Sequence, residues 1–154
     1  MKYSIRFSDA IHIMAYIEIF QGTNLSSEMI GKSVETNPAN VRKLMGLLRN
    51  AGLIKTQAGK AAPSLAKPAD QISFFDIYRA IEGDNQLLHV DETTNPNCVI
   101  GANIQDVLNE KYSFLQKQVE NEMKQITLAE VIGDISQLET KRRPENKELV
   151  ARFL

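Results

Sequence analysis

The stretch that decides the fold is residues 26–54, which read SSEMIGKSVETNPANVRKLMGLLRNAGLI. Within it, Asn37 followed by Pro38 is the clearest helix start of the chain, because asparagine caps a first turn well and proline at the first helical position loses no hydrogen bond. Gly52 suits the left-handed position at which such a helix ends. A shorter helix capped by Ser26 precedes this one. Two helices joined by a turn of a few residues are typical of a helix-turn-helix.

Further elements flank this motif on both sides. We expect a helix over residues 8–20 before it, capped by Ser8 and Asp9. After it, residues 53–56 are expected to form a strand, and residues 57–63 to form a hairpin tip that leads into a second strand. A hairpin directly after the third helix makes the unit a winged helix-turn-helix. The alternative is a plain three-helix bundle whose β-flap serves packing only.

The second half of the chain is dominated by one long helix. Ser73 is expected to cap a helix to about Glu82, and a polar loop follows. From residue 100 to 125, apolar residues recur every three or four positions, as in an amphipathic helix. The recurring residues are Ile104, Leu108, Tyr112, Leu115, Val119 and Met123.

Such a helix is roughly 38 Å long, which exceeds what a small domain needs for its own core. We therefore expect its apolar side to form the interface of a two-fold homodimer. The alternative is a helix that folds back along its own winged domain. Thr127 is expected to cap a shorter helix to about residue 138, and the basic tail after it is a last helix on the dimer, an arm near DNA or a solvated linker.

The expected fold is mainly α-helical with a small β-wing. Its parts are a winged helix-turn-helix over residues 1–82, a linker or sensor loop over 83–99, and dimerisation helices with a C-terminal tail over 100–154. A single cysteine, Cys98, excludes an intramolecular disulfide and a cysteine-based zinc finger. The chain has neither an apolar run long enough to span a membrane nor an N-terminal signal peptide, so we expect a cytoplasmic protein without a membrane partner.

The net charge of −1 hides a strong asymmetry along the chain. Residues 26–67 hold seven lysines and arginines against two acids, whereas residues 68–140 hold four against thirteen. A basic block ahead of an acidic body suits a module that binds a polyanion such as double-stranded DNA. Random drift of charge along a surface is the alternative reading.

If the third helix enters the major groove, its N-terminal residues reach base edges. Asparagine suits adenine and arginine suits guanine, and the serines ahead of the second helix can donate to a phosphate. The expected contacts with bases are Asn37, Ala39, Asn40 and Arg42, with Lys43 behind them; those with the DNA backbone or minor groove are Ser26, Ser27, Lys55, Thr56 and Lys60.

Cys98 lies just ahead of the long helix. A thiol at a helix N-terminus has a lowered pKa, which makes it a candidate redox switch through a sulfenic acid or a disulfide between subunits. The alternative is a small buried apolar residue, which describes many lone cysteines.

Enzyme motifs are absent from the sequence. It has no phosphate-cradling glycine loop, no metalloprotease helix and no serine elbow. Asp9 and His12 lie one helical turn apart and could share a metal with Cys98, but helix capping and packing explain them more simply. A one-cysteine peroxidase would need a base or an arginine beside Cys98. We expect no enzymatic activity, no cofactor and no metal site.

Five segments in this order resemble the BadM/Rrf-two family of bacterial transcription regulators, nearest to its YwnA/HypR-like branch. They are RFSDAIHIMAYI (6–17), the motif quoted above, LAKPADQISFFDIYRAIEG (65–83), NPNCVIGANIQDVL (95–108) and ITLAEVI (126–132). The resemblance implies a homodimeric winged-helix regulator, here expected to be a repressor, that reads a pseudo-palindromic operator. By position it assigns base reading to Asn37, Ala39, Asn40 and Arg42, and thiol sensing to Cys98.

The chain departs from this family's pattern at two places. The family wing often holds Arg-Gly followed by a glycine pair, whereas residues 58–62 read AGKAA. The iron–sulfur members carry several cysteines near the sensor loop and the hypochlorite-responsive branch carries a second one near the DNA-binding domain, but only Cys98 occurs here. Two alternatives therefore stay open: a ligand-responsive regulator in which Cys98 is only structural, and a protein-interaction module that has lost DNA binding.

Overall fold

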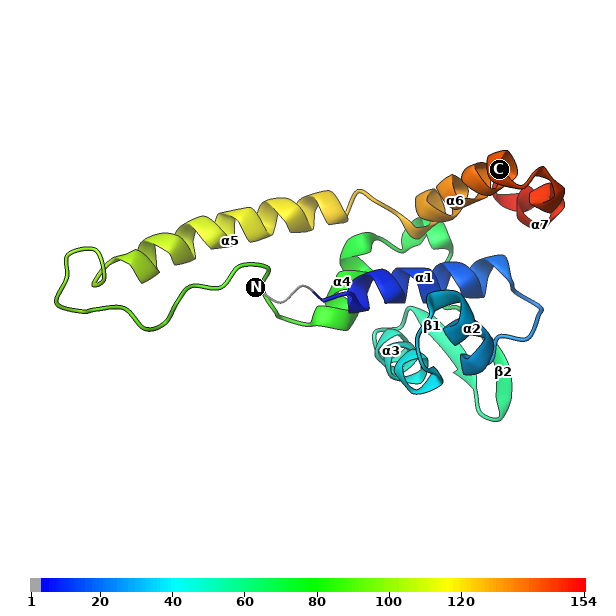
Figure 1. The fold of residues 1–154 in the computed structure, drawn as a ribbon, viewed down its shortest axis with the longest axis horizontal. Coiled ribbons are helices and arrows are strands. Elements are labelled where there is room, and N and C mark those ends of the chain that lie inside the picture. Colours follow the sequence, from blue (N-terminus) through cyan, green and yellow to red (C-terminus); the bar gives the residue numbers. More distant parts are fainter. Residues whose placement is uncertain (1–3) are drawn as a thin grey trace.

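The computed structural model describes residues 4–154 (Figure 1). Its helices and strands are α1 (Arg6–Ile19), α2 (Ser27–Val34), α3 (Pro38–Asn50), β1 (Ile54–Gln57), β2 (Lys60–Leu65), α4 (Phe74–Glu82), α5 (Ile104–Met123), α6 (Leu128–Arg142) and α7 (Lys147–Val150). Three short 3-10 helices accompany them, η1 (Ala69–Gln71), η2 (Pro144–Asn146) and η3 (Ala151–Phe153). The fold is mainly helical with a two-stranded antiparallel wing, which confirms the fold class predicted from the sequence.

The helix-turn-helix forms at the signals that the sequence carries. The Ser26 side chain accepts a hydrogen bond from the Met29 amide and so caps α2. The Asn37 side chain accepts one from the Asn40 amide at 2.7 Å and caps α3. Gly52 ends this unit with a φ of +75°, a left-handed conformation that glycine adopts without strain.

One hydrophobic core joins α1, α3, α4 and α6. Its fully buried side chains include Ile13, Leu44 and Ile77 together with Leu128 and Ile132 of α6. Two backbone hydrogen bonds of 2.8 Å join the start of α6 to the start of α4, from the Phe74 amide to the Ile126 carbonyl and from the Leu128 amide to the Ile72 carbonyl. The chain therefore returns to the same hydrophobic core after α5, which projects away from it.

α5 stands apart from this body. The segment over residues 83–103 runs away from α4 and turns back into α5, so that both extend to one side of the molecule (Figure 1). Gln116 fastens α5 to the body, because its side-chain oxygen accepts from the Leu87 amide at 2.9 Å and its nitrogen donates to the Tyr78 hydroxyl at 3.3 Å. The folded-back helix considered above is not what the structure shows.

The start of the long helix differs from the prediction. α5 begins at Ile104 and covers 20 residues, about 30 Å at the helical rise. The residues ahead of it form turns instead, in which the Thr94 hydroxyl donates to the Gly101 carbonyl and the Ala102 amide donates to the Cys98 carbonyl. Gly101 makes this packing possible, since a Cβ there would collide with the Asn95 backbone.

Two smaller expectations were wrong. Ser8 and Asp9 do not cap α1, which begins at Arg6 after Ile5, so both lie inside its first turn. The hairpin tip is only two residues long, because Gln57 already pairs with Lys60.

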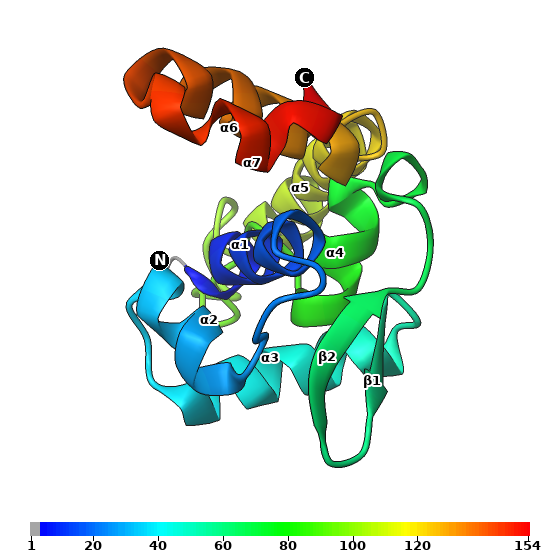
Figure 2. The same ribbon diagram turned by 90° about the vertical axis from the view of Figure 1, so that its right-hand side faces the viewer.

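The end of the chain is more ordered than a linker. α6 continues to Arg142, and the tail after it folds back through α7 onto α1, where Val150 is buried and Arg152 donates to the Glu18 carbonyl. Figure 2 shows α6 and α7 on the side of α1 opposite to α3. Among residues 4–154, no helix combines the length and apolar character needed to cross a membrane.

Candidate nucleic-acid interface

The outer face of α3 carries the side chains that can meet DNA. Val41, Leu44 and Leu48 point into the core and are fully buried. Residues three and four positions apart share a helix face, so Ala39, Arg42, Gly46 and Arg49 line the opposite side, where both arginines are exposed. The sequence analysis did not include Arg49 among the DNA contacts. Its seven-residue spacing from Arg42 was the available signal, because residues seven positions apart lie on the same face of a helix.

The wing lies directly beside this face. The Arg49 guanidinium donates to the Thr56 hydroxyl of β1 at 3.4 Å, which links the end of α3 to the hairpin. A groove of about 480 Å³ runs between them. It is lined by Ser27, Arg42, Met45, Arg49, Thr56 and Gln57. The structure thus brings the start of α2, the outer face of α3 and the wing to one surface, and Figure 2 shows the hairpin projecting next to α3.

This surface is strongly basic. We call it the basic surface and define it by its five basic residues: Arg42, Lys43, Arg49, Lys55 and Lys60. All five are exposed. None of them forms an ion pair with an acid of residues 4–154. Basic side chains without acidic partners keep their full charge available for phosphates, whose neutralisation dominates the affinity of proteins for DNA.

Two of the expected base-reading residues already hold the start of α3. The Asn37 side-chain oxygen is engaged as the helix cap, and the Asn40 side-chain nitrogen donates to the Thr36 hydroxyl at 3.0 Å. A bidentate contact with adenine uses both the oxygen and the nitrogen of an asparagine. Each asparagine therefore has half of its amide free, while Ala39 and Arg42 are exposed without such a bond.

Gly31 is a structural residue of this site that the sequence analysis missed. It is buried in α2, and a Cβ at this position would lie 2.8 Å from the Thr36 carbonyl oxygen. Only glycine lets the turn after α2 approach the helix this closely. A glycine on the inner side of a short helix was the available signal.

Cys98 lies in the turns ahead of α5 and is exposed. Hydrogen bonds from the backbone amides of Gly101 and Ile100 lower the pKa of the Cys98 thiol. The lowered pKa agrees with the prediction, but its cause is different, since α5 begins only at Ile104 and the turn supplies the amides. The alternative of a buried apolar cysteine does not describe this chain.

The predicted dimer face of α5 is only partly covered within one chain. Ile104, Leu108, Tyr112 and Met123 are half-buried, whereas Leu115 is 46% exposed and Val119 38%. Beside them, Val107 is 49% exposed and Phe114 61%, and neither was among the predicted interface residues.

Comparison with known proteins places these features in a family. The model of the Rrf2 family, described as an iron-dependent transcriptional regulator, matches residues 3–134. YwnA of Bacillus subtilis strain 168, described as an HTH-type transcriptional regulator, is 37% identical over 130 residues, which cover 84% of this chain and 96% of YwnA. A solved structure described as a DNA-binding protein is 35% identical with a TM-score of 0.68, covering 82% of this chain and 98% of that one.

The family's description mentions iron, but residues 4–154 of one chain do not offer a set of ligands that could bind an iron centre. Iron and iron–sulfur centres are held by several cysteine, histidine or carboxylate ligands. This chain has one cysteine. Within the described part of the chain, no three His, Cys, Asp or Glu side chains gather closely enough to hold a metal ion. The residues of one chain therefore do not fit an iron centre.

The fold agrees with the family match. CymR (YrzC), the global cysteine regulator of Bacillus subtilis, shares it with a TM-score of 0.62 at 23% identity, covering 86% of this chain and 96% of CymR. Because the family model spans most of the chain, from the first helix into α6, this protein belongs to the Rrf2 family of helix-turn-helix transcriptional regulators, which bind DNA and are not enzymes.

Proposed function

We propose that this protein is a homodimeric repressor that reads a pseudo-palindromic operator, with the basic surface of each protomer on one half-site. The observation that carries this proposal is the basic surface itself: five exposed basic side chains without acidic partners, on adjacent elements of a protein whose net charge is −1. Two-fold symmetry would set two such surfaces about one turn of DNA apart, roughly 34–36 Å.

The proposed contacts follow the placement of each residue. The start of α3 reads bases and the wing follows the DNA backbone or minor groove, while the amides at the start of α2 face a phosphate. The residues proposed for these contacts are Asn37, Ala39, Asn40, Arg42 and Lys43 on α3, Ser26 and Ser27 at α2, and Lys55, Thr56 and Lys60 on the wing, to which we add Arg49. We assign DNA binding to residues 1–82, sensing of the signal to residues 83–99 and dimerisation to residues 100–154. Within the last of these, α6 packs against the hydrophobic core of the DNA-binding unit.

Dimerisation through α5 rests on its uncovered apolar side. Leu115 and Phe114 expose about half or more of their surface to solvent in one chain. A helix that is apolar on one side and projects from its own body buries that side most simply against a symmetric copy. The proposed interface residues are Ile104, Leu108, Tyr112, Leu115, Val119 and Met123.

The proposed signal is oxidation of Cys98. Hypochlorite takes two electrons from the thiolate, which becomes a sulfenic acid while chloride leaves. A second Cys98 thiol, from the partner subunit, then displaces the sulfenic oxygen as water and forms a disulfide. Because Cys98 lies at the end of the arm that carries α5, such a bond would change the angle between the protomers and thereby the spacing of their recognition helices.

The test of DNA binding is fluorescence anisotropy of the reduced protein on labelled duplex DNA from upstream of its own gene. We expect affinity to fall steeply as salt rises. Arg49→Ala should weaken binding and lower the salt slope by about one, because one phosphate contact is lost. Lys117→Ala is the control. Lys117 lies on α5, away from the basic surface and on the side of α5 opposite to Leu115, so the affinity and the salt slope should both stay unchanged. Equal effects of the two substitutions would contradict the proposed surface.

Hypochlorite added to the same sample tests the signal. We expect the wild-type protein to leave the DNA and Cys98→Ser to stay bound. Release of both proteins, or of neither, would remove Cys98 from the mechanism. A reporter gene behind the same DNA tests repression, since deletion of this protein should raise its expression.

A further inference from the structure

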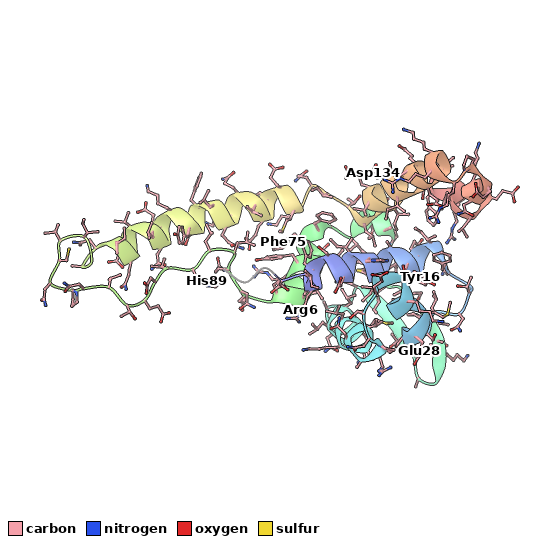
Figure 3. All side chains as sticks on the ribbon, in the orientation of Figure 1. Arg6, Tyr16, Glu28, Phe75, His89 and Asp134 are labelled. Carbon is pink, nitrogen blue, oxygen red and sulfur yellow. The ribbon has the colours of Figure 1, made fainter. Side chains whose placement is uncertain are left out.

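A cavity of about 530 Å³ lies between α1 and the C-terminal part of the chain, away from the basic surface and from Cys98. One wall is the outer side of α1, with Ile11, Tyr16 and Ile19 among its residues. The other wall is formed by α6 and the tail, through Ile135 and Leu149. Figure 3 labels Tyr16 in the C-terminal half of α1. The volume lies within the roughly 300–1,000 Å³ that small-molecule sites occupy.

The second wall is an addition to the part of the chain that defines the family. The family model ends at residue 134, and every lining residue from α6 and the tail comes after it. These lining residues are Ile135, Glu139, Arg143, Asn146, Leu149 and Val150. The tail therefore closes over a surface of α1 that the matched part of the chain leaves open.

The tail is held firmly in this position. Glu139 accepts from the Arg143 guanidinium at 2.6 Å and from the Asn146 side chain at 2.7 Å, which joins the end of α6 to η2. Further along, Val150 is buried, and Arg152 donates to the Glu18 carbonyl at the end of α1. Both ends of the tail are thus anchored, and the cavity between the tail and α1 remains open.

The chemistry of the lining indicates the kind of occupant. Tyr16 and Phe20 form an aromatic pair on the α1 wall, with ring centroids 4.5 Å apart. The two formally charged residues of the lining, Glu139 and Arg143, neutralise each other. The remaining polar groups include the hydroxyls of exposed Ser8 and half-buried Tyr16, and neither hydroxyl has a hydrogen-bond partner among residues 4–154. A charged ligand would find no unmatched charge there, and removing a charge from water without a partner is costly.

We propose that this cavity binds an uncharged aromatic molecule that carries a hydroxyl or amide group. The ring packs against Tyr16 and Phe20, and the polar group bonds to the free hydroxyls. The site also touches the DNA-binding unit, because its lining residues His12 of α1 and Ser33 of α2 are joined by a hydrogen bond of 2.7 Å. Under the proposed function, an occupant that displaces this bond shifts α2 and changes DNA affinity.

Binding is tested with N-phenyl-1-naphthylamine, an uncharged aromatic probe whose fluorescence rises in apolar surroundings. The wild-type chain should bind it saturably, one molecule per chain. Ile135→Trp fills the cavity from α6 and should weaken binding at least about tenfold. Leu138→Trp introduces the same side chain on the same helix at a residue that is half exposed and outside the lining, and should bind as wild type does.

The outcomes separate this site from the proposed function. Lack of saturable binding by the wild type, or equal binding by the two tryptophan variants, would overturn the site. If Ile135→Trp does not fold by circular dichroism, Leu149→Trp takes its place, since Leu149 lines the same cavity from α7. In the DNA assay, saturating probe should change the affinity of wild type and not of Ile135→Trp; unchanged wild-type affinity would overturn the regulatory role. Failure of DNA binding without any probe would instead count against the proposed function.

Discussion

Gly31 shows how a single residue holds the helix-turn-helix together. A methyl group at this position would lie 2.8 Å from the Thr36 carbonyl oxygen, closer than real Cβ atoms come to backbone. The contact is with backbone atoms, which cannot rotate away as a side chain can. The spacing between α2 and α3, and hence the aim of the recognition helix, therefore depends on the absence of this methyl group.

Gly31→Ala should destabilise the protein by about 1–3 kcal/mol, as overpacking in a filled core does. Gly46→Ala is the matched control, because Gly46 lies inside α3 with open space around its Cβ position. Alanine is the better helix former, so this change should stabilise by about 0.5–1 kcal/mol. Urea unfolding followed by circular dichroism measures both. A Gly31→Ala variant as stable as the wild type, or more stable, would show that the close approach at Gly31 is unimportant.

Cys98 should react as a thiol with a lowered pKa. Because backbone amides of Gly101 and Ile100 stabilise the thiolate, a larger fraction of it is present at neutral pH than for an ordinary cysteine. The rate of alkylation by iodoacetamide, followed against pH, should have its midpoint below that of a cysteine-containing peptide. Gly101→Ala breaks the close packing against Asn95 and should move the midpoint upward. Identical midpoints for both proteins would show that the turn has no effect on the thiol.

At the scale of whole elements, the C-terminal tail is the part whose order depends on a few polar contacts. Hydrogen bonds from Arg143 and Asn146 lower the pKa of the Glu139 carboxyl. A carboxyl whose pKa is lower in the folded state stabilises that state above its ordinary pKa, and this contribution is lost as pH falls through the lowered value. The tail should therefore loosen in acid.

Glu139→Gln should loosen the tail already at neutral pH, since an uncharged amide holds Arg143 more weakly than a carboxylate does. Hydrogen exchange of the α7 amides should be several-fold faster than in wild type. Glu148→Gln, at an exposed acid of α7, should exchange as wild type does. When pH falls below the lowered pKa of Glu139, the wild type should become as loose as Glu139→Gln. A difference that persists in acid would mean that ionised Glu139 does not hold the tail.

At the scale of the whole molecule, the chain consists of a packed body and a projecting arm. In the body, α1, α3, α4 and α6 pack around one core, while α5 contacts it through Gln116 and Glu120 and keeps an apolar side uncovered. A projecting apolar helix is costly in water unless a second chain covers it.

Leu115→Glu should convert the dimer to monomers, because the charge would be buried at the interface without a partner. The fold of the single chain should survive, since Leu115 is 46% exposed. Lys117→Glu places the same side chain on the opposite side of α5 and should leave the dimer intact. Sedimentation velocity measures the mass of each, and circular dichroism the helix content. A wild type that sediments as a monomer, or a dimer that survives Leu115→Glu, would refute dimerisation through this side.

The sequence by itself determined the order of the helices and strands from α1 to α6 and most of their starts, but not the fold of the tail. Asn37 ahead of Pro38, Ser73 and Thr127 each mark a helix start, and in the structure each of the three capping side chains accepts a hydrogen bond from the amide three residues on. Such signals are local, so they do not depend on the rest of the fold. The amphipathic pattern of α5 likewise follows from spacing alone, although its first turn was placed too early because Gly101 packs against Asn95.

Only the tertiary structure decided which groups remain free to act. The Asn40 amide is partly engaged by Thr36, Arg49 joins the wing through Thr56, and the thiol of Cys98 is tuned by a turn rather than by a helix end. The tail covers the cavity beside α1, and Arg152 joins the far end of this tail to the carbonyl of Glu18. Contacts between distant residues arise only when the core brings their elements together, and no spacing along the sequence encodes them individually.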